Sequence, residues 1–352
     1  MTVEQPKSVL MLGGSGVVGA GAARFLRRWH PSLRLTVAGR NLDRARRIAD
    51  ELGGAAAITV DLSREDLGMP VDSRYSAVVA TVWDEQLQGL AYAQRHSLPY
   101  LSISSGMVDL APEVIASAQR GGATPVLVSS HWFAGLLVLA TMELAREFDQ
   151  VDGIRLGALI DDQDLGGPAG MEELARWSGL PPAGYVRRGG VFVWIGGEDA
   201  QASVRAVDGV LVPGFAMAYP DVPSLALATG AREVRFDLAI GESSGRRRGE
   251  APTMEIRIDL DGVDAAGNPL SRGYYLLHPQ GQAPLTSLGV ALGVERMLGL
   301  GDEPAVDAGI QTPEAILAPA YAVGRMVEMG SAFLDAATCR PIEGHFAANA
   351  AK

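Results

Sequence analysis

Glycines crowd the point where the first apolar run of the chain gives way to a helical pattern. Residues 9–19 read VLMLGGSGVVG, in which Gly14, Gly16 and Gly19 match the pattern G-x-G-x-x-G, and helical spacing continues over Val17–Trp29. The first glycine of such a turn permits a tight bend, the second lets the backbone approach a pyrophosphate, and the third lets the helix lie close to the strand. Unpaired amides at the helix N-terminus would then face the phosphates. The stretch predicts a dinucleotide-binding turn, and a glycine-rich turn without a ligand is the alternative.

Short apolar runs alternate with helical patterns over the first 130 residues. The runs are Ser8–Leu12, Leu33–Ala38, Ala57–Val60, Ala77–Thr81, Tyr100–Ile103 and Pro125–Val128. Between most of them lie the helical patterns Val17–Trp29, Leu42–Leu52, Gln86–His96 and Pro112–Gly121. Strands that are buried on both faces read as continuous apolar runs, and strands alternating with helices form a parallel sheet. Residues 1–130 are therefore predicted to be a Rossmann domain, a doubly wound parallel sheet of the α/β class.

The pattern changes after residue 130. Trp132–Phe148 is predicted to be one long helix. The strand predictions that follow are Gly153–Ile160, Val191–Ile195, Val204–Val212, Glu233–Ile240, Glu255–Leu260 and Gly273–Leu277. Several of these runs alternate apolar and charged residues, which is typical of a strand with one wet face. Residues 131–310 are predicted to form a mixed α/β substrate and dimerisation domain with a largely antiparallel sheet.

Two further segments are predicted from their turn and capping residues. Gly241–Glu250 (GESSGRRRGE) is predicted to be an exposed loop or hairpin tip whose arginines are solvated. Thr312, Pro313 and Glu314 suit the start of a helix, which Pro319 would break before another helix runs to about Ala336. Residues 311–352 are predicted to be a C-terminal helical segment.

Bulk properties exclude several classes of protein. The length of 352 residues suits two domains, because single cores rarely exceed roughly 250–300 residues. A net charge of −11 and a pI near 5.0 argue against a nucleic-acid partner. The longest strongly apolar run, Trp132–Met142, falls short of the roughly 20 residues that span a bilayer, and no signal-peptide pattern precedes it. The single cysteine, Cys339, excludes a disulfide within the chain and argues against a cysteine zinc site. A cytoplasmic protein without metal or membrane partner is expected.

The end of the second strand indicates which dinucleotide is bound. An NAD site usually places Asp or Glu there to bind the ribose hydroxyls, but Gly39, Arg40 and Asn41 follow this strand. The guanidinium of Arg40 can fork onto a 2′-phosphate and stack on adenine. The span from residue 24 to residue 47 holds eight arginines and one acid in an otherwise acidic chain. NADP is therefore the predicted cofactor. Asp61, after the third strand, would lie near the adenine or cap the following turn.

Three further stretches carry a family resemblance. They are Val37–Asn41 (VAGRN), Leu98–Gly106 (LPYLSISSG) and Gly309–Glu314 (GIQTPE), the last followed by Pro319. Together with the glycine turn, and in this order, they resemble the saccharopine dehydrogenase/reductase-like family of NAD(P)-dependent oxidoreductases. The chain departs from that family at Ser102, where Asp is usual, at Met107, where Glu is frequent, and at residues 130–135, which replace a G-x-x-P-G segment.

The resemblance implies a Rossmann domain, an inserted mixed α/β domain and a C-terminal segment that returns to the first domain. It also implies a homodimer through the second domain, where the apolar run Val191–Ile195 would permit a shared sheet edge. Ligands of parallel sheets bind outside the carboxyl ends of the strands, so the loops after Thr81 and Ile103 should border the nicotinamide. The predicted cofactor-binding residues are Gly13, Gly14, Ser15, Gly16, Val17, Val18, Gly19, Gly39, Arg40, Asn41, Asp61, Thr81, Val82, Ser104 and Ser105.

Hydride transfer needs orientation, a dry pocket and a proton source. His131 is the first candidate proton donor, because it follows the last Rossmann strand and its ordinary pKa suits neutral pH. A histidine that caps the following helix is the structural alternative. Tyr219 is a second catalytic candidate, with Asp221 as an amine-binding or basic group, although a Tyr-Pro-Asp turn explains both residues equally well.

Three functions remain open at this point. The first is an NADP-dependent oxidoreductase that reduces an imine, or oxidises a secondary amine, at a C–N bond of a small metabolite. The second is a trans-acting enoyl (C=C) reductase. The third is an NADP-binding sensor or assembly protein without turnover.

Overall fold

The computed structural model describes residues 6–70, 73–103, 107–120, 122–164, 167 and 183–342. Contacts within the chain divide it into two units. Unit 1 comprises Met1–Ser130 and Thr286–Leu317, and unit 2 comprises His131–Leu285 and Ala318–Lys352. The three-segment division into 1–130, 131–310 and 311–352 stays a prediction, and each unit is described by itself below.

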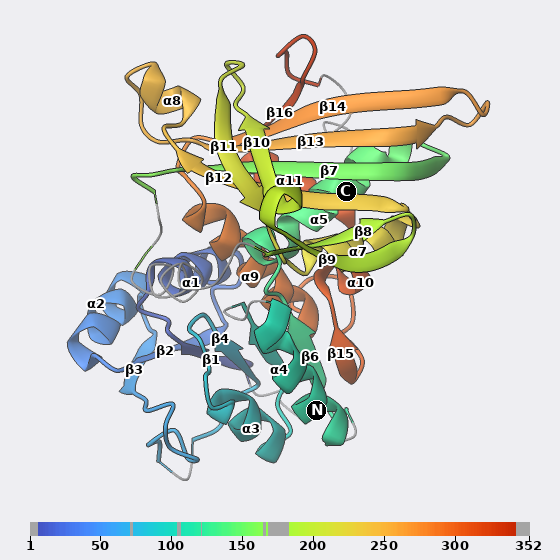
Figure 1. Cartoon of the computed structure of the whole chain (residues 1–352). Helices are drawn as coiled ribbons and strands as arrows, with labels where there is room; N and C mark the ends of the chain where they lie inside the picture. Colours follow the sequence, from blue (N-terminus) through green and yellow to red (C-terminus); the bar gives the residue numbers. More distant parts are fainter. Residues whose placement is uncertain are drawn as a thin grey trace. The chain divides into compact units, whose positions relative to one another are not determined.

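Unit 1 is built on a parallel sheet of seven strands in the order β15-β6-β5-β4-β1-β2-β3 (Figure 1). The strands are β1 (Ser8–Leu12), β2 (Arg34–Gly39), β3 (Ala56–Thr59), β4 (Ala77–Ala80), β5 (Tyr100–Ser102), β6 (Pro125–Val128) and β15 (Gly309–Gln311). The helices are α1 (Val17–Trp29), α2 (Leu42–Leu52), α3 (Gln88–Arg95), α4 (Met107–Gln119), α9 (Ala283–Leu298) and α10 (Pro313–Ile316). Strands β1 and β4 are neighbours, so the direction of winding reverses beside the glycine turn, as in other doubly wound sheets.

Helices cover both faces of this sheet. Successive side chains of a strand point to opposite faces, and nearly all of them are buried in the central strands. Leu10, Val78 and Tyr100 pack in one core cluster with Leu90 of α3 and Leu110 of α4. The opposite face is closed by α9, where a Cβ at Gly293 would lie 2.8 Å from Leu101 and 2.9 Å from Leu127. The predicted doubly wound parallel sheet is therefore confirmed.

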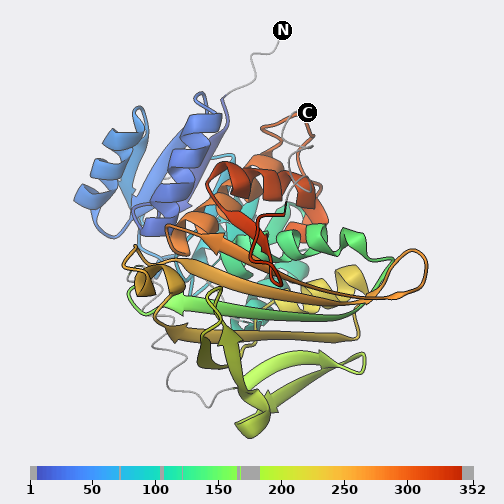
Figure 2. The same ribbon diagram turned by 90° about the horizontal axis from the view of Figure 1, so that it is seen from above.

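Unit 2 contains a mixed sheet of nine strands in which β12 and β7 are the parallel pair and the other pairs are antiparallel (Figure 2). The main path runs β10-β11-β12-β7-β13-β14-β16, with β8 pairing to β12 and to β9. The strands are β7 (Gln150–Asp161), β8 (Ala183–Arg188), β9 (Val191–Gly196), β10 (Gln201–Arg205), β11 (Leu211–Ala216), β12 (Glu233–Gly241), β13 (Met254–Val263), β14 (Pro269–His278) and β16 (Ala332–Asp335). The helices are α5 (Leu136–Leu144), α7 (Asp221–Thr229), α8 (Ser244–Arg247) and α11 (Pro319–Glu328). A second domain with a largely antiparallel sheet is confirmed.

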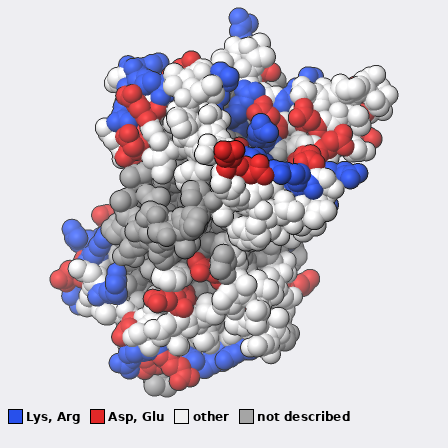
Figure 3. All heavy atoms as spheres, viewed as in Figure 1, with Lys and Arg blue, Asp and Glu red and all other residues white. Residues whose placement is uncertain are grey.

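Charged side chains on this sheet are paired locally rather than gathered by sign. Figure 3 shows acidic and basic side chains interspersed over the strands at the upper right of the view. Arg235 Nε lies 2.6 Å from Asp237 Oδ1 on β12, and Arg257 Nη2 lies 2.6 Å from Asp259 Oδ1 on β13. Each pair spans two residues on one face of a strand, so the charges neutralise each other within the strand.

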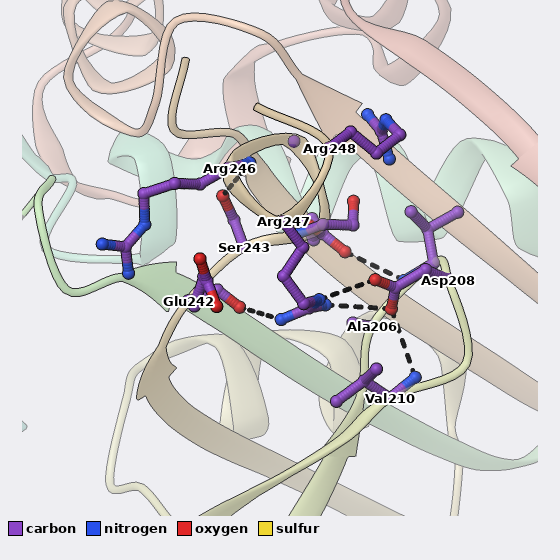
Figure 4. Close-up of polar contacts among 12 residues, drawn as sticks. Ala206, Asp208, Val210, Glu242, Ser243, Arg246, Arg247 and Arg248 are labelled. Atoms are coloured by element: carbon purple, nitrogen blue, oxygen red, sulfur yellow. Dashed lines mark hydrogen bonds and ion pairs between the residues drawn. The ribbon is translucent and has the colours of Figure 1, made fainter. Parts of the chain in front are cut away.

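The arginines of residues 246–248 form ion pairs, which corrects the prediction of a solvated loop. Arg247 makes a bidentate contact with Asp208, with nitrogen–oxygen distances of 2.7 and 2.9 Å (Figure 4). Arg246 Nε lies 3.0 Å from Asp161 Oδ2, and Arg248 pairs with Glu250. The segment is also not all loop, because it contains the short helix α8. These contacts fasten α8 to the end of β7 and to the turn between β10 and β11.

Three other predictions of secondary structure were wrong. The single helix predicted for 132–148 is a one-turn 3₁₀ segment (Trp132–Gly135), then α5, then a second 3₁₀ turn (Ala145–Glu147). The single strand predicted for 204–212 is the hairpin of β10 and β11, whose turn contains Gly209 with φ +89°. The break predicted at Pro319 is confirmed, because α10 ends at Ile316 and α11 begins at Pro319, where proline fits the first helical position; the error lies in the predicted length of the second helix. That helix ends at Glu328, and β16 replaces the rest of the predicted helix.

Among the described residues, none of the helices combines the length and the apolar character that a membrane span requires.

Candidate functional site

The glycine turn of unit 1 is closed by its own backbone and leaves no room for side chains. Gly13 has φ +74°, and its amide donates to Ala38 O of β2 at 3.0 Å, while the Gly16 amide donates to Gly13 O at 2.8 Å. A Cβ at Gly14 would lie 2.8 Å from Met11 O. A Cβ at Gly19 would lie 2.6 Å from both Gly13 O and Thr81 Oγ1. The turn therefore requires glycine at these positions for steric reasons, as the sequence indicated.

The turn ends in the bare positive end of α1. Gly16 is the N-cap, no side chain caps this end, and the first turn contains no acidic residue. The first amides of a helix have no partner within it, and the helix dipole adds partial positive charge there. Ser15, Gly16 and Val17 line a cleft of about 360 Å³ at this point. The other residues that line the cleft are Ala20, Arg24, Arg44, Arg47, Ile48 and Glu51.

No carboxylate follows β2, and the cations of the cleft come from the neighbouring helices. Arg40, directly after β2, is exposed. Arg44 and Arg47 lie on one face of α2, three residues apart, and were not predicted as site residues. The signal that could have found Arg44 is its place in the first turn of the helix that follows the strand. Arg24 is already paired with Glu51 at 2.6 Å, so Arg44 and Arg47 supply most of the basic character of the cleft, which Arg40 does not line.

Three other predicted cofactor residues have structural contacts of their own. Gly39 packs so closely that a Cβ there would lie 3.3 Å from Ser15 Oγ. Asn41 caps α2, because its Oδ1 accepts from the Arg44 amide at 2.9 Å. Asp61 accepts from the Ser63 hydroxyl at 2.6 Å and the Ser63 amide at 2.9 Å, and these bonds hold the pKa of Asp61 below its usual value. Asp61 thus braces the turn after β3, and whether it also contacts adenine stays a prediction.

The residues after β4 lie against the glycine turn. Thr81 Oγ1 donates to Leu12 O at 3.0 Å, and Val82 Cβ lies 3.0 Å from where a Cβ on Gly13 would stand. Val18 is partly buried. Ser104 and Ser105 lie outside the described residues, so their predicted role at the nicotinamide stays a prediction. In unit 1 the structure therefore gathers the glycines, Ser15, Val17, Thr81 and Val82 at the carboxyl ends of β1 and β4.

The three predicted catalytic residues come together in unit 2 around Trp132. Asp221 Oδ2 accepts from the Trp132 amide at 2.9 Å, and the Tyr219 ring lies 5.0 Å from the Trp132 ring in an edge-on contact. His131 Nε2 is 2.8 Å from Ser224 Oγ. His131 and Asp221 are buried, whereas Tyr219 is partly exposed. The sequence analysis missed Ser224, whose only signal is its position three residues after Asp221 on α7.

The backbone that follows His131 is strained. Phe133 and Ala134 have φ values of 55° and 54° with ψ 37°, and Gly135 has φ 98°. The left-handed region costs a non-glycine residue roughly 1–2 kcal/mol, and such outliers cluster at functional sites. The side chains of Phe133 and Ala134 are buried, at 3% and 1% exposure, so packing holds the strained backbone in place.

Comparison with known proteins supports the fold. No protein-family model and no curated protein sequence matches the chain. Among solved structures, the chain is similar to apo saccharopine dehydrogenase (L-Glu forming) from Saccharomyces cerevisiae, with a TM-score of 0.66 and 13% identity over 92% of this chain and 98% of that one. It also matches scyllo-inositol dehydrogenase from Lactobacillus casei with bound NAD(H), with TM-score 0.46, 12% identity and coverage of 95% and 100%. A probable dehydrogenase from Thermotoga maritima matches with TM-score 0.48, 11% identity and coverage of 94% and 99%. The similarity to the yeast protein confirms the fold that the family resemblance implied.

Proposed function

We propose that the chain is an NADP-dependent oxidoreductase that reduces an imine of a small metabolite at its C–N bond. The observation that carries the proposal is the uncapped positive end of α1 beside a cleft lined by Arg24, Arg44 and Arg47. The glycine turn fits a dinucleotide, because glycine lets the turn and the start of α1 pack as tightly on the strands as such a turn requires. The resemblance of the sequence to the saccharopine dehydrogenase/reductase-like family supports chemistry at a C–N bond, and the chain shares its fold with the yeast saccharopine dehydrogenase.

The cations favour NADP over NAD. A 2′-phosphate adds two negative oxygens near the end of β2, where NAD enzymes place an acid that would repel it. Arg40 is exposed directly after β2, and Arg44 begins the next helix on the side of the cleft. Two guanidinium groups can hold a phosphate by charge-assisted hydrogen bonds. The neighbouring Asn41 then serves α2 as its cap rather than the nucleotide.

His131 is the proposed proton donor. When bound, NADPH supplies the hydride, which adds to the imine carbon. The chain must then deliver one proton to the nitrogen, so that C=N becomes an amine with the atoms balanced. A histidine titrates in the range that this step needs, and burial excludes water from its surroundings. Trp132 and Tyr219 would offer an apolar wall to the substrate.

Binding of the two nucleotides tests the cofactor. Arg40→Ala and Arg44→Ala should each weaken NADPH binding by about ten- to a hundredfold and leave NADH binding nearly unchanged, because each removes a charged hydrogen bond. Arg46→Ala is the matched control for Arg44→Ala. Arg46 is on the same helix as Arg44, but it pairs with Asp43 and does not line the cleft. Calorimetry or fluorescence quenching measures the affinities. Equal affinity of the wild type for NADPH and NADH would refute the assignment of NADP.

Turnover tests the reaction. We expect NADPH consumption with cyclic imines or with keto acids plus amines, and none with enones. Consumption with enones alone would replace the C–N assignment with an enoyl reductase. Saturable NADPH binding without consumption by any member of the panel would favour a sensor or assembly protein.

A further inference from the structure

Two side chains of one helical turn hold the strained segment that carries His131. Asp221 and Ser224 both lie in the first turn of α7, and they contact Trp132 and His131 respectively. The strain lies in the next two residues, Phe133 and Ala134. A left-handed pair of this kind persists only when its surroundings over-determine it. The contacts from α7 are two polar contacts in those surroundings.

The contact of Ser224 orients the imidazole. Its Oγ lies 2.8 Å from Nε2, so one ring nitrogen of His131 is committed to the hydroxyl. If Nε2–H donates to Ser224 Oγ, the exchangeable proton sits on Nδ1, and the same bond strengthens when the ring is charged. The titratable neighbours in the cluster are Asp221, on the same turn of α7, and Tyr219, two residues before it.

We propose that Ser224 and Asp221 are positioning residues, which hold the strained turn and fix which ring nitrogen of His131 exchanges its proton. The catalytic role of this arrangement rests on the proposed function. Its effect on the titration of His131 does not depend on that function. Neither residue needs to touch the substrate. Asp221, which the sequence suggested as an amine-binding or basic group, acts here through the Trp132 amide instead.

The experiment compares Ser224→Ala with Ser224→Thr in the full chain. NMR follows the titration of the His131 ring, assigned by the signal missing in His131→Asn, and steady-state kinetics follow kcat/KM against pH. Ser224→Ala should lower the measured pKa of His131 by about half a unit, because it removes a hydrogen bond that favours the charged ring. The alkaline limb of the pH profile should move to lower pH by the same amount. Ser224→Thr, which keeps the hydroxyl, should restore both.

Thr229→Ala is the matched control. Thr229 also lies on α7, where its hydroxyl donates to Leu225 O at 2.6 Å and accepts from the Ala231 amide at 3.2 Å, and neither bond reaches the turn after His131. It should leave the His131 titration in place. A shift in Thr229→Ala as large as that in Ser224→Ala would overturn the proposal, because the effect would then belong to the helix as a whole.

The remaining outcomes separate this inference from the proposed function. A folded Ser224→Ala variant whose His131 titrates within about 0.2 units of the wild type would overturn the inference, whatever the activity. Absence of NADPH turnover with every substrate would refute the proposed function, and the NMR titration would still decide the role of Ser224. Asp221→Asn, which keeps an oxygen acceptor for the Trp132 amide, should preserve the fold and the position of the turn.

Discussion

At the scale of single residues, His278 links stability to pH. It lies at the end of β14 with no exposed surface, and its Nδ1 is 3.1 Å from Ser331 Oγ. Burial lowers the pKa of His278 from 6.5 to about 4. The unfolded chain therefore takes up this proton near pH 6.5, whereas the folded chain resists until about pH 4.

The free energy of unfolding should be insensitive to His278 above pH 7. Between pH 6.5 and pH 4 it should fall by up to about 3 kcal/mol from this residue, because each unit of pKa shift corresponds to about 1.4 kcal/mol. Urea unfolding of the wild type and of His278→Gln at several pH values isolates the effect, since other titrations cancel in the difference. A difference between the two proteins that does not change with pH would contradict this assignment.

Some residues of the candidate site could be predicted from the sequence and others could not. The need for glycine at positions 14 and 19 is visible in the sequence through the G-x-G-x-x-G pattern, although a Cβ at Gly19 would also meet Thr81, 62 residues away. The contact of Ser224 with His131 joins residues 93 apart in the chain, so no local pattern announces it. The left-handed Phe133 and Ala134 are invisible for a further reason, since neither residue type favours that conformation.

At the scale of elements, a substitution at the C-terminal end of α3 can stabilise the fold. The Leu98 amide donates to Ala93 O at 2.8 Å and the Ser97 amide to Gln94 O at 3.3 Å, which is the bonding of a Schellman motif. Ser97 is exposed and has φ 54°, a conformation that glycine adopts without strain. Ser97→Gly should therefore raise the free energy of unfolding by about 0.5–1 kcal/mol. Ser32→Gly, at an exposed position without positive φ, is the control and should not stabilise. Chemical denaturation measures both, and a destabilised Ser97→Gly would contradict the motif.

The elements that the sequence predicted best are those whose pattern is local and strong. α1 and α2 match their predicted bounds because amphipathic spacing runs their whole length. β15 and β16 were missed because strands of three and four residues carry too little pattern, and they form only by pairing with β6 and β14. The β10–β11 hairpin did leave a signal, since Asp208 and Gly209 are a typical tight-turn pair.

At the scale of the whole molecule, the edge of β9 predicts self-association. β9 pairs only with β8 among the described residues, contains no charge or proline, and exposes Val191 at 61% and Trp194 at 55%. Exposed apolar edges of this kind pair with other chains unless they are protected. Arg188, at the end of β8, already pairs with Asp199 of the same chain, with 3.4 Å between Nη1 and Oδ2. A second copy related by a two-fold axis would place its own β9 against this edge.

We expect a dimer in solution, as the family resemblance implied. Trp194→Glu should weaken dimerisation at least tenfold, or about 1.4 kcal/mol, because it would bury a charge at the shared edge. Leu211→Glu is the matched control, with 54% exposure on β11. Sedimentation equilibrium measures both. A wild type that is monomeric at micromolar concentration, or a dimer that survives Trp194→Glu, would exclude this edge.

The chain leaves and re-enters unit 1, because residues 286–317 complete what residues 1–130 begin. A gene fragment cut after the sixth strand would encode the glycine turn and yet lack α9, the helix that shields Leu101 and Leu127. Such a fragment would expose apolar side chains of its sheet and would tend to aggregate. Moving unit 1 into another protein therefore requires two segments of the chain, residues 1–130 and residues 286–317, and not one continuous segment.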